Sequence, residues 1–137
     1  MAHWLVKSEP GTYSWARMVA DKRTNWNGVR NFQAAKNLKT MAVGDTCFFY
    51  HSGEERAVVG VVEVAKTYYP DPTDKTGTFG MVDVKALKPL KSPVTLAQIK
   101  ADAALATIAL VRQSRLSVMP IDAAAWAKIL KLGGGMA

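Results

Sequence analysis

Alternating apolar and polar positions begin the chain, and a helical spacing follows them. The run His3–Lys7 alternates and is rich in β-favouring side chains, so we expect a strand that stops at Glu9-Pro10-Gly11. Ser14 is a suitable N-cap, because apolar residues behind it recur at helical spacing. The apolar face of this predicted helix consists of Trp15, Met18 and Val19.

The turn-rich segment Asn25–Gly28 carries a large aromatic residue and precedes a second helical pattern. Asn31 is placed to cap that helix. Its buried stripe is expected to contain Phe32, Ala35 and Leu38.

The pattern then changes to that of β-strands. Cys47–His51 and Ala57–Lys66, separated by a polar turn, predict a hairpin because β-branched and aromatic residues fill both runs. A loop with Pro and Gly over residues 68–80 leads to a strand over about Met81–Leu87, and we expect a turn at Lys88-Pro89.

The C-terminal part mixes short helical and extended patterns. Thr95 is suited to cap a short helix, and residues 105–111 fit a helix or a strand equally well. Arg115–Ile121 predicts a strand, and Asp122 should cap a last helix that ends at Gly133–Gly135. Strands interrupted by helices without regular βαβ alternation predict an α+β domain around a mostly antiparallel, barrel-like sheet. We expect one domain over residues 1–133 and a flexible tail over residues 134–137.

Composition narrows the class of protein. The chain has 137 residues, of which 49% are hydrophobic, so it can bury a core without disulfides or a structural metal. No apolar run approaches the roughly 20 residues of a membrane span, and we expect neither a membrane partner nor an export signal. One cysteine, Cys47, and two separated histidines give no metal-ligand cluster, so we expect no metal and no cofactor. A cytoplasmic monomer is the expectation, or a nuclear one in a eukaryote.

Charge points toward a polyanionic partner. Lys and Arg number 18 against 11 Asp and Glu, for a formal net charge of +7. No acidic residue occurs between Asp21 and Asp45, so the basic residues of this interval are candidates for phosphate contacts. They are Lys22, Arg23, Arg30, Lys36 and Lys39.

Motifs of nucleotide-processing enzymes are missing from the sequence. It contains neither G-x-x-x-x-G-K-[ST] nor G-x-G-x-x-G, and its glycine triplet follows the last helix instead of opening one. Cys47 and His51 are four residues apart on a predicted strand, which separates them by roughly 13 Å. A catalytic thiolate–imidazole pair is therefore not indicated.

Each of three polar stretches fits either a functional role or a purely structural one. Lys7-Ser8-Glu9 offers a cation, a hydroxyl and a carboxylate at a strand end, for acid–base work on a nucleobase or for simple capping. Trp26–Asn31 offers an indole, amides and an arginine for base binding, although a Trp usually packs into the core. Arg112–Ser117 is either an exposed sheet face or a binding edge.

With these segments in view, the sequence closely resembles the EVE domain family of the PUA-like superfamily. Six motifs occur in order over nearly the whole chain, and together they make an accidental match improbable. The motifs are Trp4–Pro10, Trp26–Asn31, Phe48–Ser52, Tyr69–Pro72, Val82–Val84 and Arg115–Pro120.

The resemblance implies a PUA-like mixed β pseudobarrel with flanking α-helices and a cleft that accepts a nucleobase. It also implies a modified base, such as methylated or hydroxymethylated cytosine in DNA, and relatives in the superfamily bind RNA. Motif by motif, the implied base pocket consists of Ser8, Trp26, Asn31, Tyr50, His51, Ser52, Ser114, Arg115 and Ser117.

We therefore expect a nucleic-acid-binding module without catalysis, whose partner is DNA with modified bases or RNA. One alternative is a hydrolase of a modified nucleobase or nucleoside, because PUA-like relatives of the ASCH type hydrolyse acylated cytidine with Lys, Thr and an acid. Lys7 and Glu9 only faintly match that arrangement. The other alternative is an RNA-binding domain indifferent to modification.

Overall fold

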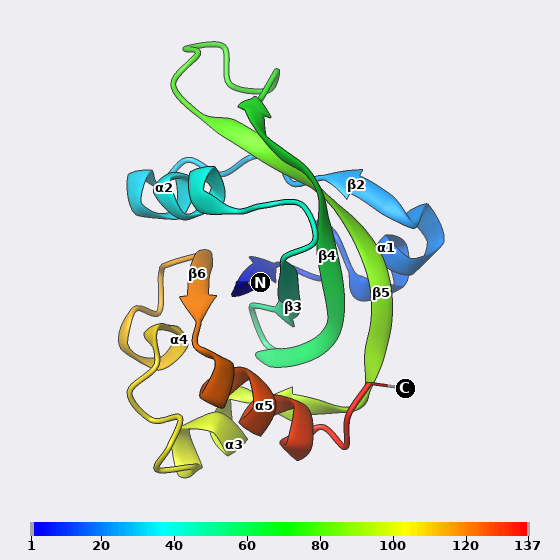
Figure 1. Cartoon of the computed structure of the whole chain (residues 1–137), viewed down its shortest axis with the longest axis vertical. Helices are drawn as coiled ribbons and strands as arrows, with labels where there is room; N and C mark the ends of the chain where they lie inside the picture. Colours follow the sequence, from blue (N-terminus) through cyan, green and yellow to red (C-terminus); the bar gives the residue numbers. More distant parts are fainter. Residues whose placement is uncertain (1, 137) are drawn as a thin grey trace.

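One mixed sheet organises the computed structural model, which describes residues 2–136 (Figure 1). The strands are β1 (His3–Ser8), β2 (Arg23–Asn25), β3 (Thr46–His51), β4 (Ala57–Pro70), β5 (Gly80–Thr95) and β6 (Val118–Ile121). The helices are α1 (Trp15–Asp21), α2 (Phe32–Thr40), α3 (Leu96–Ala101), α4 (Ala109–Arg112) and α5 (Ala123–Leu132). The predicted α+β class is confirmed.

The strand order is β2-β5-β4-β3-β1-β6, so the first and last strands of the chain pair with each other at one edge of the sheet. β1 pairs in parallel with β3 and antiparallel with β6, and the other neighbours are antiparallel. β4 and β5 form a long, strongly curved hairpin that bends around β3 and gives the sheet its barrel-like shape (Figure 1). The pocket described below lies where β1 ends.

Side-chain caps start the helices where the sequence predicts them. Ser14 accepts a hydrogen bond from the Arg17 N–H, and Asp122 accepts one from the Ala125 N–H. Thr95 forms a capping box, in which its own N–H also donates to the side chain three residues on. Such caps satisfy N–H groups that a helix leaves without partners, which is why they are readable in sequence.

Two predictions about extended segments are wrong. The expected turn at Lys88-Pro89 is part of β5, where these two residues pair with Val61 and Gly60 between two shifts of register that let the ladder accept a proline. The expected strand over Arg115–Ile121 begins only at Val118, because the Leu116 N–H donates to the Gln113 carbonyl and closes a turn. The ambiguous segment 105–111 ends in the short helix α4.

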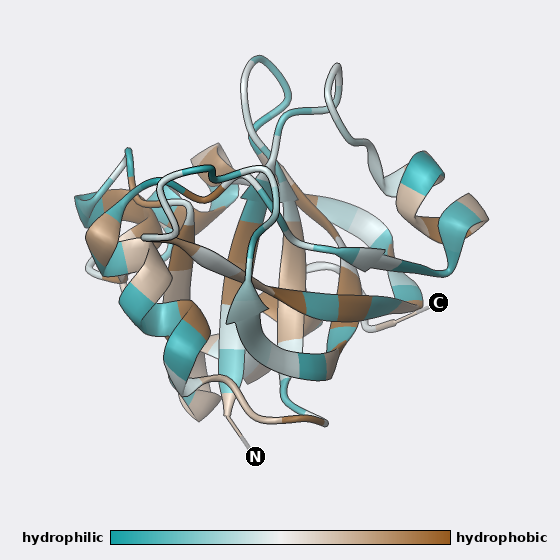
Figure 2. Ribbon diagram, turned by 90° about the horizontal axis from the view of Figure 1, so that it is seen from above, coloured by the Kyte–Doolittle hydropathy of each residue, from teal (hydrophilic) through white to brown (hydrophobic). Residues whose placement is uncertain are grey.

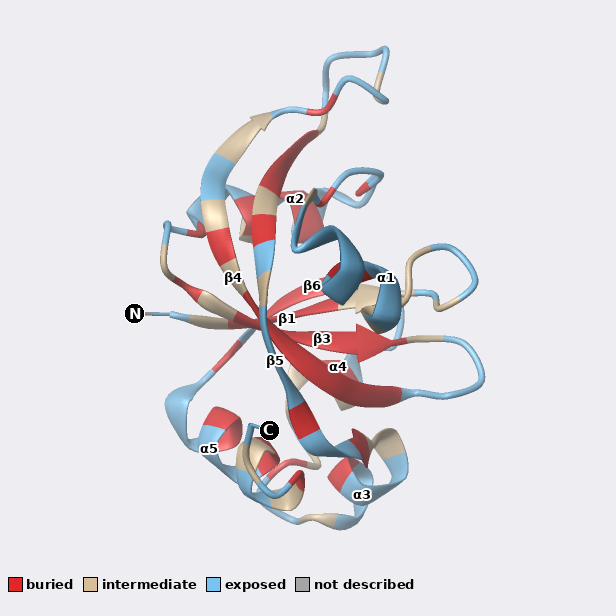
Figure 3. Cartoon of the chain, turned by 90° about the vertical axis from the view of Figure 1, so that its right-hand side faces the viewer, coloured by how far each residue is buried: buried red, intermediate tan, exposed pale blue. Residues whose placement is uncertain are grey.

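The core lies on both sides of β3. Apolar strand positions gather at the centre of the molecule and hydrophilic residues line the outer loops and helix faces (Figures 2 and 3). Phe48 stacks on Trp126 of α5 with ring centroids 3.8 Å apart, and Phe49 meets Trp15 edge-on from the other side. A Cβ at Gly60 would lie 2.5 Å from the Trp15 ring, so only glycine lets that ring reach β4.

The C-terminal glycines run back along β5. The carbonyls of Gly133 and Gly135 accept hydrogen bonds from the N–H groups of Ser92 and Lys91, and Met136 bridges to Leu90. The segment predicted as a flexible tail thus contacts the sheet up to residue 136, and its last residue, 137, lies outside the described residues.

Candidate functional site

A pocket of about 530 Å³ opens beside the end of β1. Its wall consists of Lys7–Glu9, Thr12 and Tyr13, Thr24–Arg30, and Ser117. The sheet order explains this combination, because β1 lies next to β6, which follows Ser117, and the first two stretches are continuous with β1. The volume is in the range of small-molecule and cofactor sites, roughly 300–1,000 Å³.

Asp71 holds the loop that forms one side of the pocket. Its fully buried carboxylate accepts hydrogen bonds from the Gly28 N–H at 2.8 Å and from Arg30 Nη1 at 3.1 Å. The other oxygen accepts from the N–H and hydroxyl of Thr73 at 2.8 and 2.6 Å. Burial by itself would raise the pKa of Asp71, but the bonds from Thr73, Gly28 and Arg30 outweigh it and lower the pKa to about 2. The carboxylate therefore ties the loop after β2 to the loop after β4.

The backbone conformation of Gly28 allows its N–H to reach Asp71. Its φ is 80°, in the left-handed region that favours glycine, and its N–H is the one that points to Asp71. A turn-rich sequence predicts an irregular loop here but does not reveal its distant carboxylate anchor.

Trp26 forms the inner part of the pocket wall and is only 8% exposed. It meets Phe49 and Tyr13 edge-on, with centroids 5.5 and 6.4 Å away, so most of the indole belongs to the core. No group among residues 2–136 accepts a hydrogen bond from its Nε1, and this nitrogen is not completely buried. The indole N–H of Trp26 therefore remains available as a donor to a ligand.

Lys7 brings a positive charge to the same wall. Its ammonium donates to the Ser114 carbonyl at 2.9 Å and lies 5.8 Å from the centroid of the Tyr50 ring. No carboxylate lies within ion-pair distance of it among the described residues. Burial lowers the pKa of Lys7, which means that its charge is poorly compensated in the protein. An acceptor group on a ligand would supply what the protein does not.

The structure brings three of the predicted base-pocket residues together: Ser8, Trp26 and Ser117 all line the pocket. The Ser8 hydroxyl donates to the Tyr13 carbonyl and still has lone pairs to accept a hydrogen bond. The main chain of Ser117 accepts from the Lys7 N–H at 2.9 Å, which fixes its position at the rim.

Tyr50, His51 and Ser52 are neighbours of this wall but do not line it. In the parallel pair, Tyr50 and His51 lie opposite Lys7 and Ser8, and both are buried. His51 Nε2 accepts a hydrogen bond from the Trp15 N–H and its Nδ1 lies 2.6 Å from the Glu55 carboxylate, so this ring holds the start of α1. The Ser52 N–H donates to the Ser8 carbonyl.

Asn31, Ser114 and Arg115 also lie outside the pocket wall. Asn31 caps α2 by accepting from the Ala34 N–H at 2.9 Å. Ser114 contributes only its carbonyl, to Lys7, and Arg115 is exposed in the turn before β6.

The predicted phosphate-binding residues differ in whether other groups of the protein already contact their charged ends. Arg30 lines the pocket, Arg23 forms an ion pair with Asp83 at 3.0 Å, and Lys39 lies over the Tyr68 ring at 5.5 Å. Lys22 and Lys36 are exposed, and within the described part of the chain neither has an acidic partner at ion-pair distance.

Several polar pocket residues were not predicted as base ligands: Glu9, Thr12, Tyr13, Thr24, Asn25 and Asn27. Glu9 belongs to the polar cluster Lys7-Ser8-Glu9, which the sequence did indicate as a candidate site. For Thr24 and Asn25 the sequence contained no such indication, because the pairing of β2 with Val84 and Asp83 of β5 places them at the pocket.

Over residues 2–136, no three His, Cys, Asp or Glu side chains are grouped as metal ligands, and no helix has the length and apolar character of a membrane span. Burial raises the pKa of the Cys47 thiol, so this cysteine is a poor nucleophile.

The mixed sheet, its flanking helices and the pocket at the end of β1 define a PUA-like α+β protein. The chain belongs to the EVE domain family, whose sequence profile matches residues 2–132. Human thymocyte nuclear protein 1 is 30% identical over 154 residues, which cover 88% of this chain and 68% of the human protein.

Solved structures agree with the assignment. A protein of Rhodopseudomonas palustris is 49% identical, with a TM-score of 0.93 over 98% of this chain and 94% of that one. Human thymocyte nuclear protein 1, solved in complex with DNA that contains 5-methylcytosine, has a TM-score of 0.89 at 30% identity over 97% of this chain and 98% of that one. An ASCH protein of Zymomonas mobilis shares the fold alone, at 10% identity and a TM-score of 0.58.

Proposed function

We propose that this protein binds nucleic acid by taking one modified cytosine, methylated or hydroxymethylated, into the pocket at the end of β1 without altering it. The observation that carries the proposal is the wall of this pocket of about 530 Å³, which contains Lys7 and Trp26. Among residues 2–136, the Lys7 ammonium has no ion-pair partner and the Trp26 indole N–H has no acceptor. A relative with the same fold is known in complex with 5-methylcytosine DNA, which supports the same ligand class here.

The chemistry of the wall suits cytosine. The base carries carbonyl and ring-nitrogen acceptors, which Lys7 and Trp26 can satisfy, and an exocyclic amine, which a carboxylate such as that of Glu9 can accept. Apolar surface of Tyr13 and Val29 is available to a methyl group. Burying one methyl contributes about 0.8 kcal/mol, and good packing raises this to roughly 1–3 kcal/mol, so we expect about tenfold preference for the marked base.

Affinity should come largely from the nucleic-acid backbone. Extruding a base from a duplex costs a few kcal/mol, which the pocket contacts must first offset. Lys22 and Lys36 are exposed, and among residues 2–136 neither has an ion-pair partner, so both are available to contact phosphates. The affinity should therefore fall steeply as the salt concentration rises, because phosphate contacts release counterions. The ratio of affinities for modified and unmodified cytosine should persist, because both duplexes make the same phosphate contacts.

The direct test is a titration, followed by tryptophan fluorescence, with duplexes that differ in one cytosine mark at low and at moderate salt. We expect the marked duplex to bind about tenfold more tightly at both salt concentrations. Equal, salt-sensitive binding to every duplex would show that only the basic surface takes part. Competition with matched RNA distinguishes a DNA reader from an RNA-binding domain.

Lys7→Met should separate binding from folding. We expect affinity for the marked duplex to fall by about tenfold, since a charged hydrogen bond to the base is lost. The midpoint of thermal unfolding should not fall, because burial of the Lys7 charge costs folding energy and Met retains the apolar stem.

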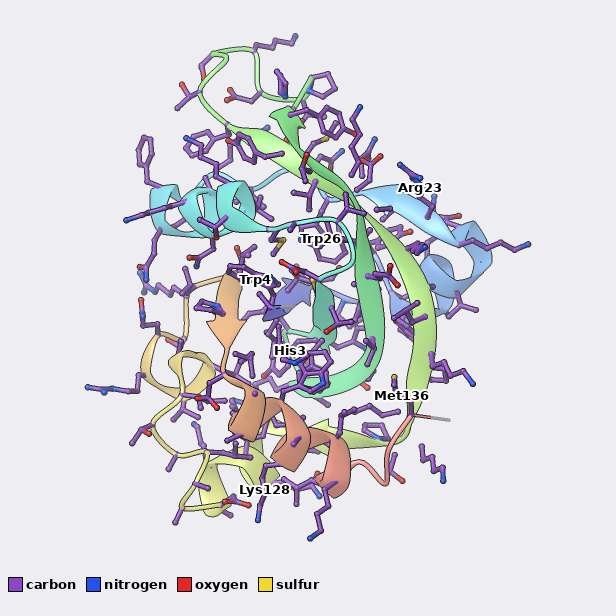
Figure 4. The ribbon with its side chains drawn as sticks, in the orientation of Figure 1. His3, Trp4, Arg23, Trp26, Lys128 and Met136 are labelled. Carbon is purple, nitrogen blue, oxygen red and sulfur yellow. The ribbon has the colours of Figure 1, made fainter. Side chains whose placement is uncertain are left out.

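The matched control is Lys128→Met, which removes the same charge from α5, away from Trp26 (Figure 4). It should leave the preference for the mark unchanged. A lower unfolding temperature for Lys7→Met together with full affinity would assign Lys7 a structural role instead.

A hydrolase is the second candidate, because the pocket gathers Lys7, Glu9, Thr12 and Thr24, which are the residue types of such chemistry. Incubation with modified nucleosides and mass detection of the products decides between the two. Altered product would favour the enzyme, and unchanged nucleoside with measurable binding would favour the reader.

A further inference from the structure

A pair of aromatic side chains lies on the outer surface next to the pocket. Phe32, the first residue of α2, is 74% exposed, so its predicted place in the buried stripe of this helix is wrong. Its ring contacts that of Phe79 with centroids 5.1 Å apart and planes inclined by 41°. The Arg30 guanidinium lies 5.9 Å from the centroid of the Phe79 ring. An aromatic ring this exposed contributes little to the stability of the fold, and exposed aromatic surface is typical of binding sites.

The pair is held in place from both sides. Asn31 caps the helix that begins with Phe32. The Phe79 N–H donates to the Asp74 carboxylate at 2.7 Å, and the loop after β4 is tied to Arg30 by the Asp71 ion pair. The two rings therefore come from segments far apart in sequence, α2 and the loop between β4 and β5 (Figure 1). They form a preorganised surface.

Arg30 connects this surface to the pocket. It belongs to the pocket wall and at the same time packs against Phe79. The surroundings are basic, with Lys36 one helical turn after Phe32 and Lys75 in the adjoining loop. Of the acidic groups of that loop, Asp71 is buried and paired with Arg30, and Asp74 accepts hydrogen bonds within its own loop. Charge and position both suit an anionic chain whose one base enters the pocket.

We propose that Phe32 and Phe79 form a second nucleobase contact, which stacks on the base next to the one held in the pocket. The inference rests on the proposed function. When a base leaves the helical stack, its neighbour exposes one face to water, and an aromatic side chain can replace the lost partner. Arg30 lies between the two sites and is suited to contact the phosphate that joins the two nucleotides.

Stacking on an aromatic ring is tolerant of base identity, because every base has a π-face. The Phe32–Phe79 surface would therefore add affinity and fix the direction of the strand without reading sequence. This differs from the pocket, where hydrogen bonds discriminate between bases.

The test is a binding cycle with Phe32→Ala and duplexes that carry one 5-methylcytosine. Two further duplexes each carry the same 5-methylcytosine and an abasic site, one on the 5′ side of the 5-methylcytosine and the other on its 3′ side. On the complete duplex we expect Phe32→Ala to weaken binding by at least about fivefold. On one of the two abasic duplexes the same substitution should change binding by less than about twofold, since the stacking partner is gone.

Two variants serve as controls. Phe32→Tyr keeps the ring and should retain affinity, and Val43→Ala removes an exposed apolar side chain, 62% exposed, from the turn after α2 and should have no effect. Because Phe32 is mostly exposed, Phe32→Ala should leave the thermal unfolding midpoint unchanged.

An equal loss on complete and abasic duplexes overturns the stacking proposal, and so does the absence of any loss. In either case a retained preference of the wild type for the marked duplex leaves the pocket proposal standing. No binding of any oligonucleotide by the wild type would overturn both.

Discussion

Asp71→Asn is expected to lower the free energy of unfolding by about 3 kcal/mol at neutral pH. The carboxylate accepts four hydrogen bonds, two on each oxygen, from Gly28, Arg30 and Thr73. An amide has only one acceptor oxygen, so whichever way it turns, its NH₂ group faces at least one N–H donor that cannot accept. The Arg30 charge also loses its buried partner.

The effect should depend on pH in a defined direction. The pKa of Asp71 is lowered from 3.8 to about 2, so its ionised form stabilises the folded state above about pH 4. That stabilisation, about 2 kcal/mol from the shift, is lost as the pH falls through about 2. Urea unfolding of wild type and Asp71→Asn across this range should give a difference that shrinks toward the acid end. A difference independent of pH would contradict the assigned role.

Binding should suffer as well, because the loop that Asp71 holds carries Gly28 and Arg30 of the pocket wall. Ordering even one residue costs about 1–2 kcal/mol, so affinity for a marked duplex should fall by roughly tenfold. Glu63→Gln is the matched control, since it removes a partly exposed carboxylate 3.7 Å from Lys85. That pair should contribute less than about 1 kcal/mol and leave binding unchanged.

The sequence predicts those parts of the fold that depend on local chemistry. Ser14, Asn31, Thr95 and Asp122 each cap a helix as predicted, because a cap needs only a side chain and an N–H two or three residues away. The path of β5 through Pro89 was not predictable, since the shifts of register on either side of the proline arise from its pairing with the distant strand β4.

The candidate site is predictable only where a single segment carries it. The Trp26–Arg30 loop, which the sequence singles out, lines the pocket, and its role in base binding stays a prediction. Tyr50 and His51 illustrate the limit: Cys47–His51 is buried at every position, so alternation along β3 does not tell which side chains face a ligand. Asp71 is 43 positions from Gly28, and no local pattern joins them.

Trp26 should give the largest loss of function. Trp26→Ala removes a core side chain in contact with Phe49 and Tyr13, and we expect it to cost about 3–5 kcal/mol of folding free energy. Weaker binding by this variant would therefore mix unfolding with loss of the site. Trp26→Phe is the sharper change, because it keeps an aromatic ring in the core and removes the Nε1–H, which has no acceptor among residues 2–136.

For Trp26→Phe we expect roughly tenfold weaker binding of the marked duplex, since the base keeps a buried acceptor without a donor. Trp126→Phe is a close control: Trp126 is also 8% exposed and lacks an acceptor for its N–H among residues 2–136, but it packs on Phe48 and His3 outside the pocket. Both variants should lose about 1–2 kcal/mol of stability, measured by urea unfolding. If both lose affinity equally, the effect comes from the core; if only Trp26→Phe does, the indole N–H is a ligand contact.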